Sequence, residues 1–186
     1  MTDASRITIH IVSSVDGIIA KQDNSVSWFE TTDVYEKGVA GEDVDVAGFM
    51  KTIDCFVMGS RTYEHALELS RQYGWAYGDV PVVVVSARSL PVERHSVELY
   101  YGDLHTLVND RIRPRYKNTW VAGGAELCKS FLRLKLADEI RISILPIILG
   151  KGLLFLDGLG LEQPLHLKNT TAYRNGMVEL WYEIKK

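Results

Sequence analysis

Two glycine turns carry the residues best suited to hold a charged ligand. One lies in residues 56–64 (FVMGSRTYE) and the other in residues 120–132 (WVAGGAELCKSFL). In each, an apolar run ends at glycine and a helix-compatible pattern begins at once, so a strand end meets a helix N-terminus. Such a corner presents unpaired backbone amides and the positive end of a helix dipole, and glycine lets an anion approach closely. Two such turns predict a phosphate-bearing dinucleotide as ligand.

The side chains around the first turn and the next strand end could add charge to this site. Ser60, Arg61 and Thr62 supply hydrogen-bond donors after the glycine, and Arg88 follows the apolar run 80–85. The planar guanidinium of an arginine matches phosphate oxygens, which suits Arg88 to a 2′-phosphate. Each feature also has a structural interpretation, since threonine caps helices and most loop arginines are simply solvated.

Residues that could move protons or bind metal are few. Asp16 stands in an Asp-Gly turn after the first apolar segment, and Asp45 stands near the start of an amphipathic segment. Both also suit ordinary turn and helix-start roles. The histidines lack the spacing of metal ligands, and no GxSxG motif is present, so neither a metal site nor serine hydrolysis is indicated. Cys55 and Cys128 lie in apolar surroundings without CxxC spacing, which predicts buried free thiols.

The hydrophobic pattern predicts the elements that must position these residues. In the first two thirds of the chain, strands are expected at 6–13, 18–20, 55–58, 80–85, 97–101 and 119–122, and helices at 42–52, 62–72, 104–112 and 125–134. On the last helix, Leu127, Cys128, Phe131 and Leu134 are expected to face inward. Alternation of strand and helix indicates a parallel sheet with right-handed crossovers. The polar stretch 21–41 is expected to be irregular, and long loops of this kind are usually functional.

The last third of the chain has a different pattern. Segments 139–149, 165–173 and 177–184 are predicted strands, and Asn175-Gly176 is a strong turn signal between the last two. An antiparallel hairpin is therefore expected to complete a mixed sheet. With 186 residues and no linker, residues 1–186 are expected to form one domain.

Charge and hydrophobicity indicate which partners and which cellular location to expect. The net charge is −3 and no basic cluster is present, so nucleic acid is not an expected partner. The N-terminus lacks the features of a signal peptide and no apolar run is long enough to span a membrane, so a cytoplasmic location is expected.

Five segments in this order resemble the dihydrofolate reductase-like superfamily: SVDG, VMGSRTYE, VVVVSAR, VAGGAEL and ADEIRISILPIILGKGLLF. The last segment makes the resemblance closest to the branch that holds the C-terminal reductase domain of bacterial riboflavin biosynthesis deaminase-reductases. The resemblance implies an α/β three-layer fold with a mixed, mainly parallel sheet, flanking helices and a C-terminal antiparallel hairpin. It also implies reduction of a small heterocyclic or carbonyl/imine substrate with NADPH as cofactor.

The resemblance further assigns roles to residues of this chain. Its cofactor-binding residues are implied to be Gly59, Ser60, Arg61, Thr62, Ser86, Arg88, Gly123, Gly124, Ala125 and Glu126, with a cis peptide between the two adjacent glycines. Asp16 is implied to border the pocket for substrate and nicotinamide. Asp45, four residues before Phe49, matches the spacing of an acid that helps to protonate a pterin. Trp28 and Phe49 are the expected substrate-binding residues.

Three questions stay open at this level. The proton could come from Asp45, from Asp16 or from bound water. A non-catalytic nucleotide-binding domain that kept the fold is the alternative to an enzyme, and it would bind the cofactor without hydride transfer. The apolar segment 140–154 and nearby leucines predict a homodimer to which the C-terminal strands contribute, although a buried central strand would explain the same segment.

Overall fold

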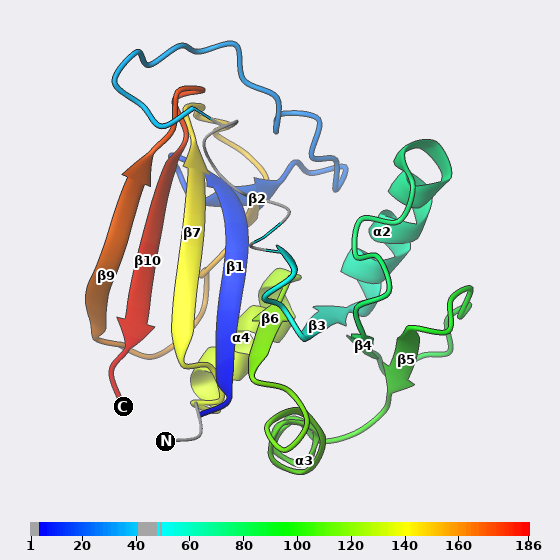
Figure 1. Ribbon diagram of the computed structural model, residues 1–186. Coiled ribbons are helices and arrows are strands. Elements are labelled where there is room, and N and C mark those ends of the chain that lie inside the picture. The colour runs from blue at the N-terminus through cyan, green and yellow to red at the C-terminus, as the bar shows by residue number, and fades with distance from the viewer. Residues whose placement is uncertain (1–3, 41–47, 49) are drawn as a thin grey trace.

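The computed structural model describes residues 4–40, 48 and 50–186, and its centre is an eight-stranded sheet (Figure 1). The sheet order is β5-β4-β3-β6-β1-β7-β10-β9. Its strands are β1 (Arg6–Ser14), β3 (Cys55–Gly59), β4 (Val82–Val85), β5 (Val97–Tyr100), β6 (Asn118–Val121), β7 (Glu139–Leu145), β9 (Leu165–Ala172) and β10 (Val178–Ile184). A separate pair joins β2 (Ile18–Ala20) to β8 (Leu153–Leu154). The helices are α2 (Ser60–Tyr73), α3 (Leu104–Thr106), the π-helix η2 (Leu107–Ile112) and α4 (Ala125–Arg133).

The strands of the main sheet run parallel from β5 to β7, and the C-terminal hairpin then reverses the direction. β1 lies between β6 and β7 and pairs with both in parallel. β10 pairs antiparallel with β7 on one side and with β9 on the other. Consequently, the C-terminal ends of β3, β4, β6 and β1 meet at one edge of the sheet, where open α/β sheets bind ligands. This is the predicted α/β fold with a mixed, mainly parallel sheet.

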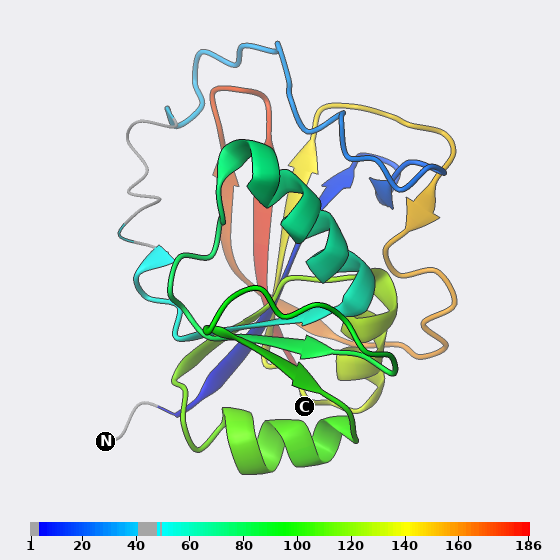
Figure 2. The same ribbon diagram turned by 90° about the vertical axis from the view of Figure 1, so that its right-hand side faces the viewer.

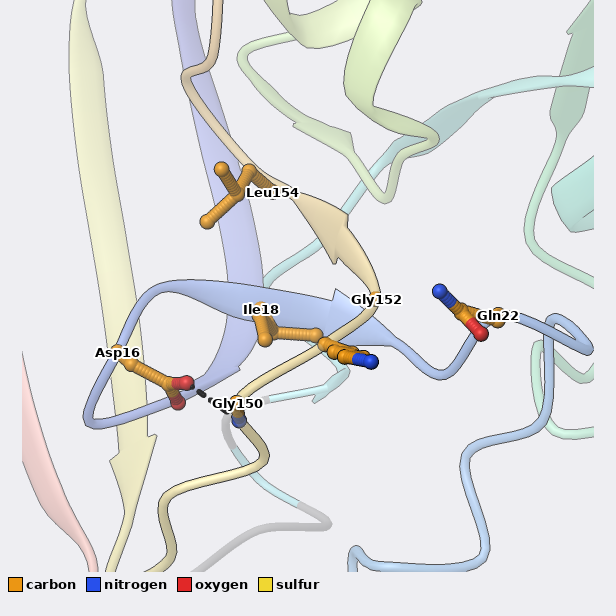
Figure 3. A pocket seen from close by; sticks show the side chains of 7 residues that line it. Asp16, Ile18, Gln22, Gly150, Gly152 and Leu154 are labelled. Carbon is orange, nitrogen blue, oxygen red and sulfur yellow. Dashed lines mark hydrogen bonds between the residues drawn. The ribbon is translucent and has the colours of Figure 1, made fainter.

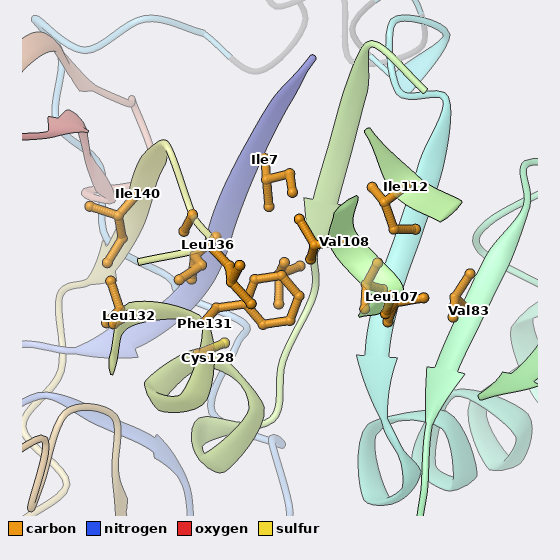
Figure 4. Close-up of a cluster of buried hydrophobic side chains, with 14 of the residues drawn as sticks. Ile7, Val83, Leu107, Val108, Ile112, Cys128, Phe131, Leu132, Leu136 and Ile140 are labelled. Carbon is orange, nitrogen blue, oxygen red and sulfur yellow. The ribbon is translucent and has the colours of Figure 1, made fainter. Parts of the chain in front are cut away.

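Helices pack on both faces of the sheet (Figures 1 and 2). On one face, buried side chains of α4 and η2 pack against β1, β6 and β7; Phe131, Leu107 and Ile9 are fully buried there (Figure 4). On the other face, Tyr63 and Leu67 of α2 pack against Phe56 and Met58 of β3. Neighbouring residues of β3 belong to opposite clusters because side chains alternate across a strand. The two apolar layers fix α2 and α4 beside the strand ends that they follow.

The long irregular stretch lies across the turn between β9 and β10. It arches over the ends of these strands (Figure 1). The backbone amide of Tyr35 donates to the carbonyl of Arg174 at 2.7 Å, and the amide of Val39 donates to Ala172 at 2.8 Å. Gly176 takes the positive φ of 78° that the predicted Asn-Gly turn requires. The loop is therefore attached to the hairpin by backbone hydrogen bonds.

Several predicted elements need correction. The strand expected at 139–149 ends at Leu145, because the chain bends at Pro146 into a loop that leads to β8, a strand that was not predicted. The helix expected at 104–112 is π-helical over its second part. Leu134, expected to face inward, lies beyond the last turn of α4 and is 37% exposed. The helix expected at 42–52 falls largely outside the described residues.

Two further expectations can be compared with the structure. Cys55 and Cys128 are free and buried, as predicted, and burial raises the pKa of each thiol to about 12. Within the described ranges, none of the helices has the length and apolar character needed to cross a membrane.

Candidate functional site

The two glycine turns lie against each other at the edge of the sheet. β3 and β6 are neighbouring parallel strands, so the turns that follow them emerge side by side. The backbone amide of Gly59 donates to the carbonyl of Gly123 at 2.8 Å. The peptide between Gly123 and Gly124 is cis, as the resemblance implied. Two segments more than sixty positions apart in the sequence therefore form one continuous backbone surface.

Both turns open directly into helices whose first residues lack a side-chain cap. Gly59 is the N-cap of α2 and Gly124 is the N-cap of α4, and neither can offer a capping oxygen from its side chain. The leading amides of a helix have no partner inside the helix, and they lie at the positive end of its dipole. The arrangement therefore concentrates two sets of donors and two dipole ends at one place, which favours an anion with more than one phosphate.

Around these turns, a ligand can approach the backbone closely because the residues are glycines. A β-carbon on Gly59 would lie 3.5 Å from the amide nitrogen of Gly124, and one on Gly124 would lie 3.4 Å from Thr62 Oγ1. Gly123 has a φ of +114°, which side-chain-bearing residues rarely adopt, and it is close to Ile11 of β1. The glycines themselves carry no side chain over this backbone, and the Thr62 hydroxyl of α2 lies close to both glycines of the second turn.

Ser86 and Arg88 lie at the neighbouring strand end, after β4. The Ser86 hydroxyl donates to the carbonyl of Arg88 at 2.7 Å and accepts from the amide of Arg88 at 3.1 Å, which fixes the backbone of this loop. Arg88 Nη2 donates to Glu64 Oε2 of α2 at 2.5 Å. The Arg88 side chain is about half exposed. The structure therefore holds a partly solvated guanidinium against α2, one turn after the first glycine turn.

Glu126, in the first turn of α4, pairs with Lys129. Lys129 Nζ lies 2.5 Å from Glu126 Oε1, and this hydrogen bond lowers the pKa of the carboxyl group. Glu126 is 78% exposed at its side chain, and Lys129 also donates to the carbonyl of Asp157. These contacts are those of a helix-start charge paired one turn along the helix, and Ala125 is buried beside it. The role of Glu126 in cofactor binding stays a prediction.

Asp16 joins the turn after β1 to the loop after β7. Its carboxylate accepts from the Ser14 hydroxyl at 2.6 Å and from the amides of Leu149 at 3.1 Å and Gly150 at 2.7 Å. These hydrogen bonds, the one from Ser14 foremost, lower the pKa of Asp16 to about 2. At neutral pH this group is a carboxylate with no proton to donate, and its contacts are those of an anchor between two loops.

A pocket of about 480 Å³ opens beside this anchor (Figure 3). Its lining residues come from the β1–β2 turn, β2 and the loop after it, and from β8 and the segment before it; they are Asp16, Ile18, Gln22, Gly150, Lys151, Gly152 and Leu154. The volume lies in the range of small-molecule sites, roughly 300–1,000 Å³. The carboxylate of Asp16 is occupied by hydrogen bonds. Among the described lining residues, Gln22 and Lys151 are the other polar side chains that could meet a ligand. Neither residue was singled out from the sequence.

The other expected pocket residues have different outcomes. Trp28 is 5% exposed and contacts Phe29 edge-on at 4.8 Å between ring centroids. Among the described residues, its indole N–H has no hydrogen-bond partner. Buried indole N–H groups usually have a hydrogen-bond partner. The role of Trp28 in substrate binding stays a prediction. Asp45 and Phe49 lie outside the described residues.

Comparison with known proteins links the whole arrangement to one family. Residues 5–179 match the model of the RibD C-terminal domain. The uncharacterized protein YwjB of Bacillus subtilis (strain 168) is 31% identical over 186 residues, which cover 95% of this chain and 97% of that protein. The uncharacterized protein YyaP of the same organism is 27% identical, over 95% of this chain and 94% of the other.

Solved structures share the fold at lower identity. A protein from Shewanella sp. PV-4, provisionally named for riboflavin biosynthesis, aligns with a TM-score of 0.79 at 24% identity, covering 97% of this chain and 99% of that one. Acinetobacter baumannii RibD in form 1 aligns at 0.69 and 16% identity, over the whole of this chain and 59% of the other. Dihydrofolate reductase from Enterococcus faecalis, complexed with NADP(H) and RAB-propyl, aligns with a TM-score of 0.60 at 12% identity, covering 97% of each chain. These likenesses establish a dihydrofolate reductase-like fold.

Proposed function

The chain belongs to the family of the RibD C-terminal domain, and from this premise we propose that it is an NADPH-dependent reductase of a small heterocyclic or carbonyl/imine compound. The substrate would resemble a riboflavin precursor or a pterin. The observation that carries the proposal is the contact between the two glycine turns, whose uncapped helices open side by side at the ends of β3 and β6.

This surface fits a dinucleotide cofactor. The amides and side chains of Ser60, Arg61 and Thr62 would hold phosphate oxygens from one side, and the turn from Gly123 to Glu126 would hold the pyrophosphate from the other. The loop of Ser86 and Arg88 would border the adenosine. Each of these segments follows a strand end at the same edge of the sheet, so a single extended molecule can reach all three.

The bound cofactor would supply the hydride, while the chain orients both partners and limits access of water. Ile11 links the two parts of the proposed site, because it lies next to Gly123 and belongs to the strand that continues to the Asp16 turn. The substrate would enter the pocket beside this turn. There Gln22 offers an amide oxygen and an amide N–H₂ to the edge of a heterocycle, and Lys151 offers a positive charge to an anionic group.

The proton that accompanies the hydride needs a separate source. Asp16 is held as a carboxylate by its hydrogen bonds. We therefore propose that Asp16 positions the pocket and that Asp45 or a bound water supplies the proton. In this proposal, the Asp16 turn affects activity by keeping the pocket in its shape.

We further propose that residues 1–186 act as one domain and that two copies associate through the C-terminal hairpin. β9 is at the edge of the eight-stranded sheet, and Leu165 and Leu167 are 39% and 49% exposed on it. An edge strand with exposed apolar side chains is a natural site for pairing with a second chain.

The function is tested by the loss of absorbance at 340 nm when NADPH is mixed with the protein and a panel of pyrimidine, pterin and quinone substrates. The proposal predicts substrate-dependent oxidation of NADPH for at least one pyrimidine or pterin. A non-catalytic nucleotide-binding domain would instead bind NADPH with a measurable Kd and oxidise none of the panel. Absence of NADPH binding would exclude both functions.

A further inference from the structure

The ion pair between Arg88 and Glu64 joins the two elements that border the proposed adenosine site. Arg88 follows β4, and Glu64 lies on α2 one turn after the glycine turn of β3. Their side chains meet at 2.5 Å between Nη2 and Oε2. The proposed function uses the arginine but assigns no role to the glutamate.

The backbone on both sides of this pair is held firmly. Ser86 fixes the backbone of Arg88 through two hydrogen bonds, and the Tyr63 hydroxyl donates to the carbonyl of Pro91 at 2.8 Å, which attaches the same loop to α2. Leu90 is buried against α2 in the same cluster as Tyr63. The loop and the helix therefore keep the guanidinium and the carboxylate next to each other.

The side chains themselves stay accessible to a ligand. Arg88 is 55% exposed and Glu64 is 38% exposed at their side chains. Exposed ion pairs contribute little to folding stability. A group from a bound nucleotide can therefore compete for either partner without a large penalty to the fold.

The two partners have opposite preferences for the two forms of a nicotinamide cofactor. A 2′-phosphate carries negative charge and acceptor oxygens, so it is attracted by the guanidinium and repelled by the carboxylate. A free 2′-hydroxyl is a donor that a carboxylate accepts, which is how acidic residues favour NAD in other nucleotide-binding folds. We infer that Arg88 and Glu64 together form the cofactor-selection site, in which Glu64 limits the preference for NADPH that Arg88 creates.

This inference rests on the proposed function and predicts that the two residues can be separated by mutation. The measured quantity is the ratio of the Kd for NADH to the Kd for NADPH. In Glu64→Gln, loss of the carboxylate removes the repulsion of the 2′-phosphate, so the ratio should rise about fivefold to tenfold. In Arg88→Ala, the ratio should fall below that of the unmodified protein.

A matched control is available on the same helix. Glu68 lies one turn further along α2, is 73% exposed at its side chain and is close to His65 rather than Arg88. Glu68→Gln removes the same charge and should leave the ratio unchanged. The effect of Glu64→Gln should also shrink as salt is added, because screening weakens interactions between exposed charges.

The experiment titrates NADPH and NADH into the unmodified protein and the three variants, using the fluorescence of the bound dihydronicotinamide, with thermal melting to verify folding. A raised ratio in Glu64→Gln alone, with a lowered ratio in Arg88→Ala, supports the selection site. An unchanged or lowered ratio in Glu64→Gln overturns it while leaving the reductase assignment in place. Failure of the unmodified protein to bind either cofactor overturns both.

Discussion

Asp16 holds two loops together through the hydrogen bonds of its carboxylate. Its carboxylate accepts hydrogen bonds from one hydroxyl and two backbone amides, which belong to segments that are far apart in the chain. The hydroxyl of Ser14, which donates to it, also accepts from the amide of Ile18 at 3.0 Å. One ionised group thus holds the β1–β2 turn against the loop that lines the pocket.

We expect Asp16→Asn to lower the melting temperature at neutral pH by a few degrees, because an asparagine N–H₂ would face a backbone amide that needs an acceptor. The pKa of Asp16 is lowered on folding, from 3.8 to about 2, so its contribution is complete above pH 4 and is lost as the pH falls towards 2. Melting curves of the two proteins should therefore converge over this range. An unchanged difference from pH 7 to pH 2 would show that the charge does not stabilise the turn. Asp79→Asn, at an exposed aspartate before β4, serves as the control.

At the scale of elements, the site depends on two helices that begin at adjacent strand ends. The strands β3 and β6 are paired in parallel, and Gly59 and Gly123 are joined by a backbone hydrogen bond. Because both N-caps are glycines, the leading amides of α2 and α4 receive no hydrogen bond from a capping side chain.

Adding a methyl group at Gly124 tests the role of this surface. In Gly124→Ala the new carbon would lie 3.4 Å from Thr62 Oγ1, an acceptable contact, and the φ of −79° suits alanine. The protein should fold, while the methyl group keeps the pyrophosphate away from the amides. Loss of one or two such hydrogen bonds should raise the Kd for NADPH about tenfold or more. An unchanged Kd in a variant with unchanged melting temperature would place the cofactor elsewhere.

Much of this element-level arrangement could be predicted from local sequence. The apolar runs and the glycines that end them identify β3, β6 and the helices that follow, because these patterns depend on a few neighbouring residues. The parallel core and the antiparallel hairpin follow from the order of the elements. The predicted ends were wrong where a proline bend intervened, at Pro146, and where the helix ended earlier than its apolar pattern, at Leu134.

The contacts that complete the site could not be predicted from local sequence, because they join distant parts of the chain. Asp16 and Leu149 are 133 positions apart, and Glu64 and Arg88 are 24 apart. No periodicity or local motif reports such a pairing, which depends on how the strands are ordered in the sheet. The sequence also gives no local signal for Gln22 and Lys151, because the pairing of β2 with β8 is what brings their segments together.

At the scale of the whole molecule, we propose that the C-terminal hairpin mediates self-association. In addition to Leu165 and Leu167 on β9, the exposed apolar side chains include Ile148 at 73% and Leu156 at 40%. The leucines near segment 140–154 that the sequence placed at the interface are Leu156, Leu159 and Leu161. Of these, Leu159 and Leu161 are only partly exposed, and Leu159 packs against the core.

Light scattering at micromolar concentration should give a mass close to twice 21.0 kDa. Leu167→Lys places a charge on the edge strand and should reduce the mass to that of one chain, since lysines on edge strands prevent pairing. Leu69→Lys, at a leucine of α2 that is 42% exposed, adds the same charge away from the hairpin and should leave the mass unchanged. A mass near 21.0 kDa for the unmodified protein would exclude the dimer.

A crystal structure with bound NADPH is the most direct test of whether the paired glycine turns bind the phosphates of a nicotinamide cofactor. If they do, pyrophosphate oxygens should lie within about 3 Å of the leading backbone amides of both α2 and α4. The adenosine should then lie beside the loop of Arg88 and the nicotinamide towards the Asp16 turn. A cofactor bound at another edge of the sheet, or touching one helix and leaving the other turn empty, would contradict this binding mode.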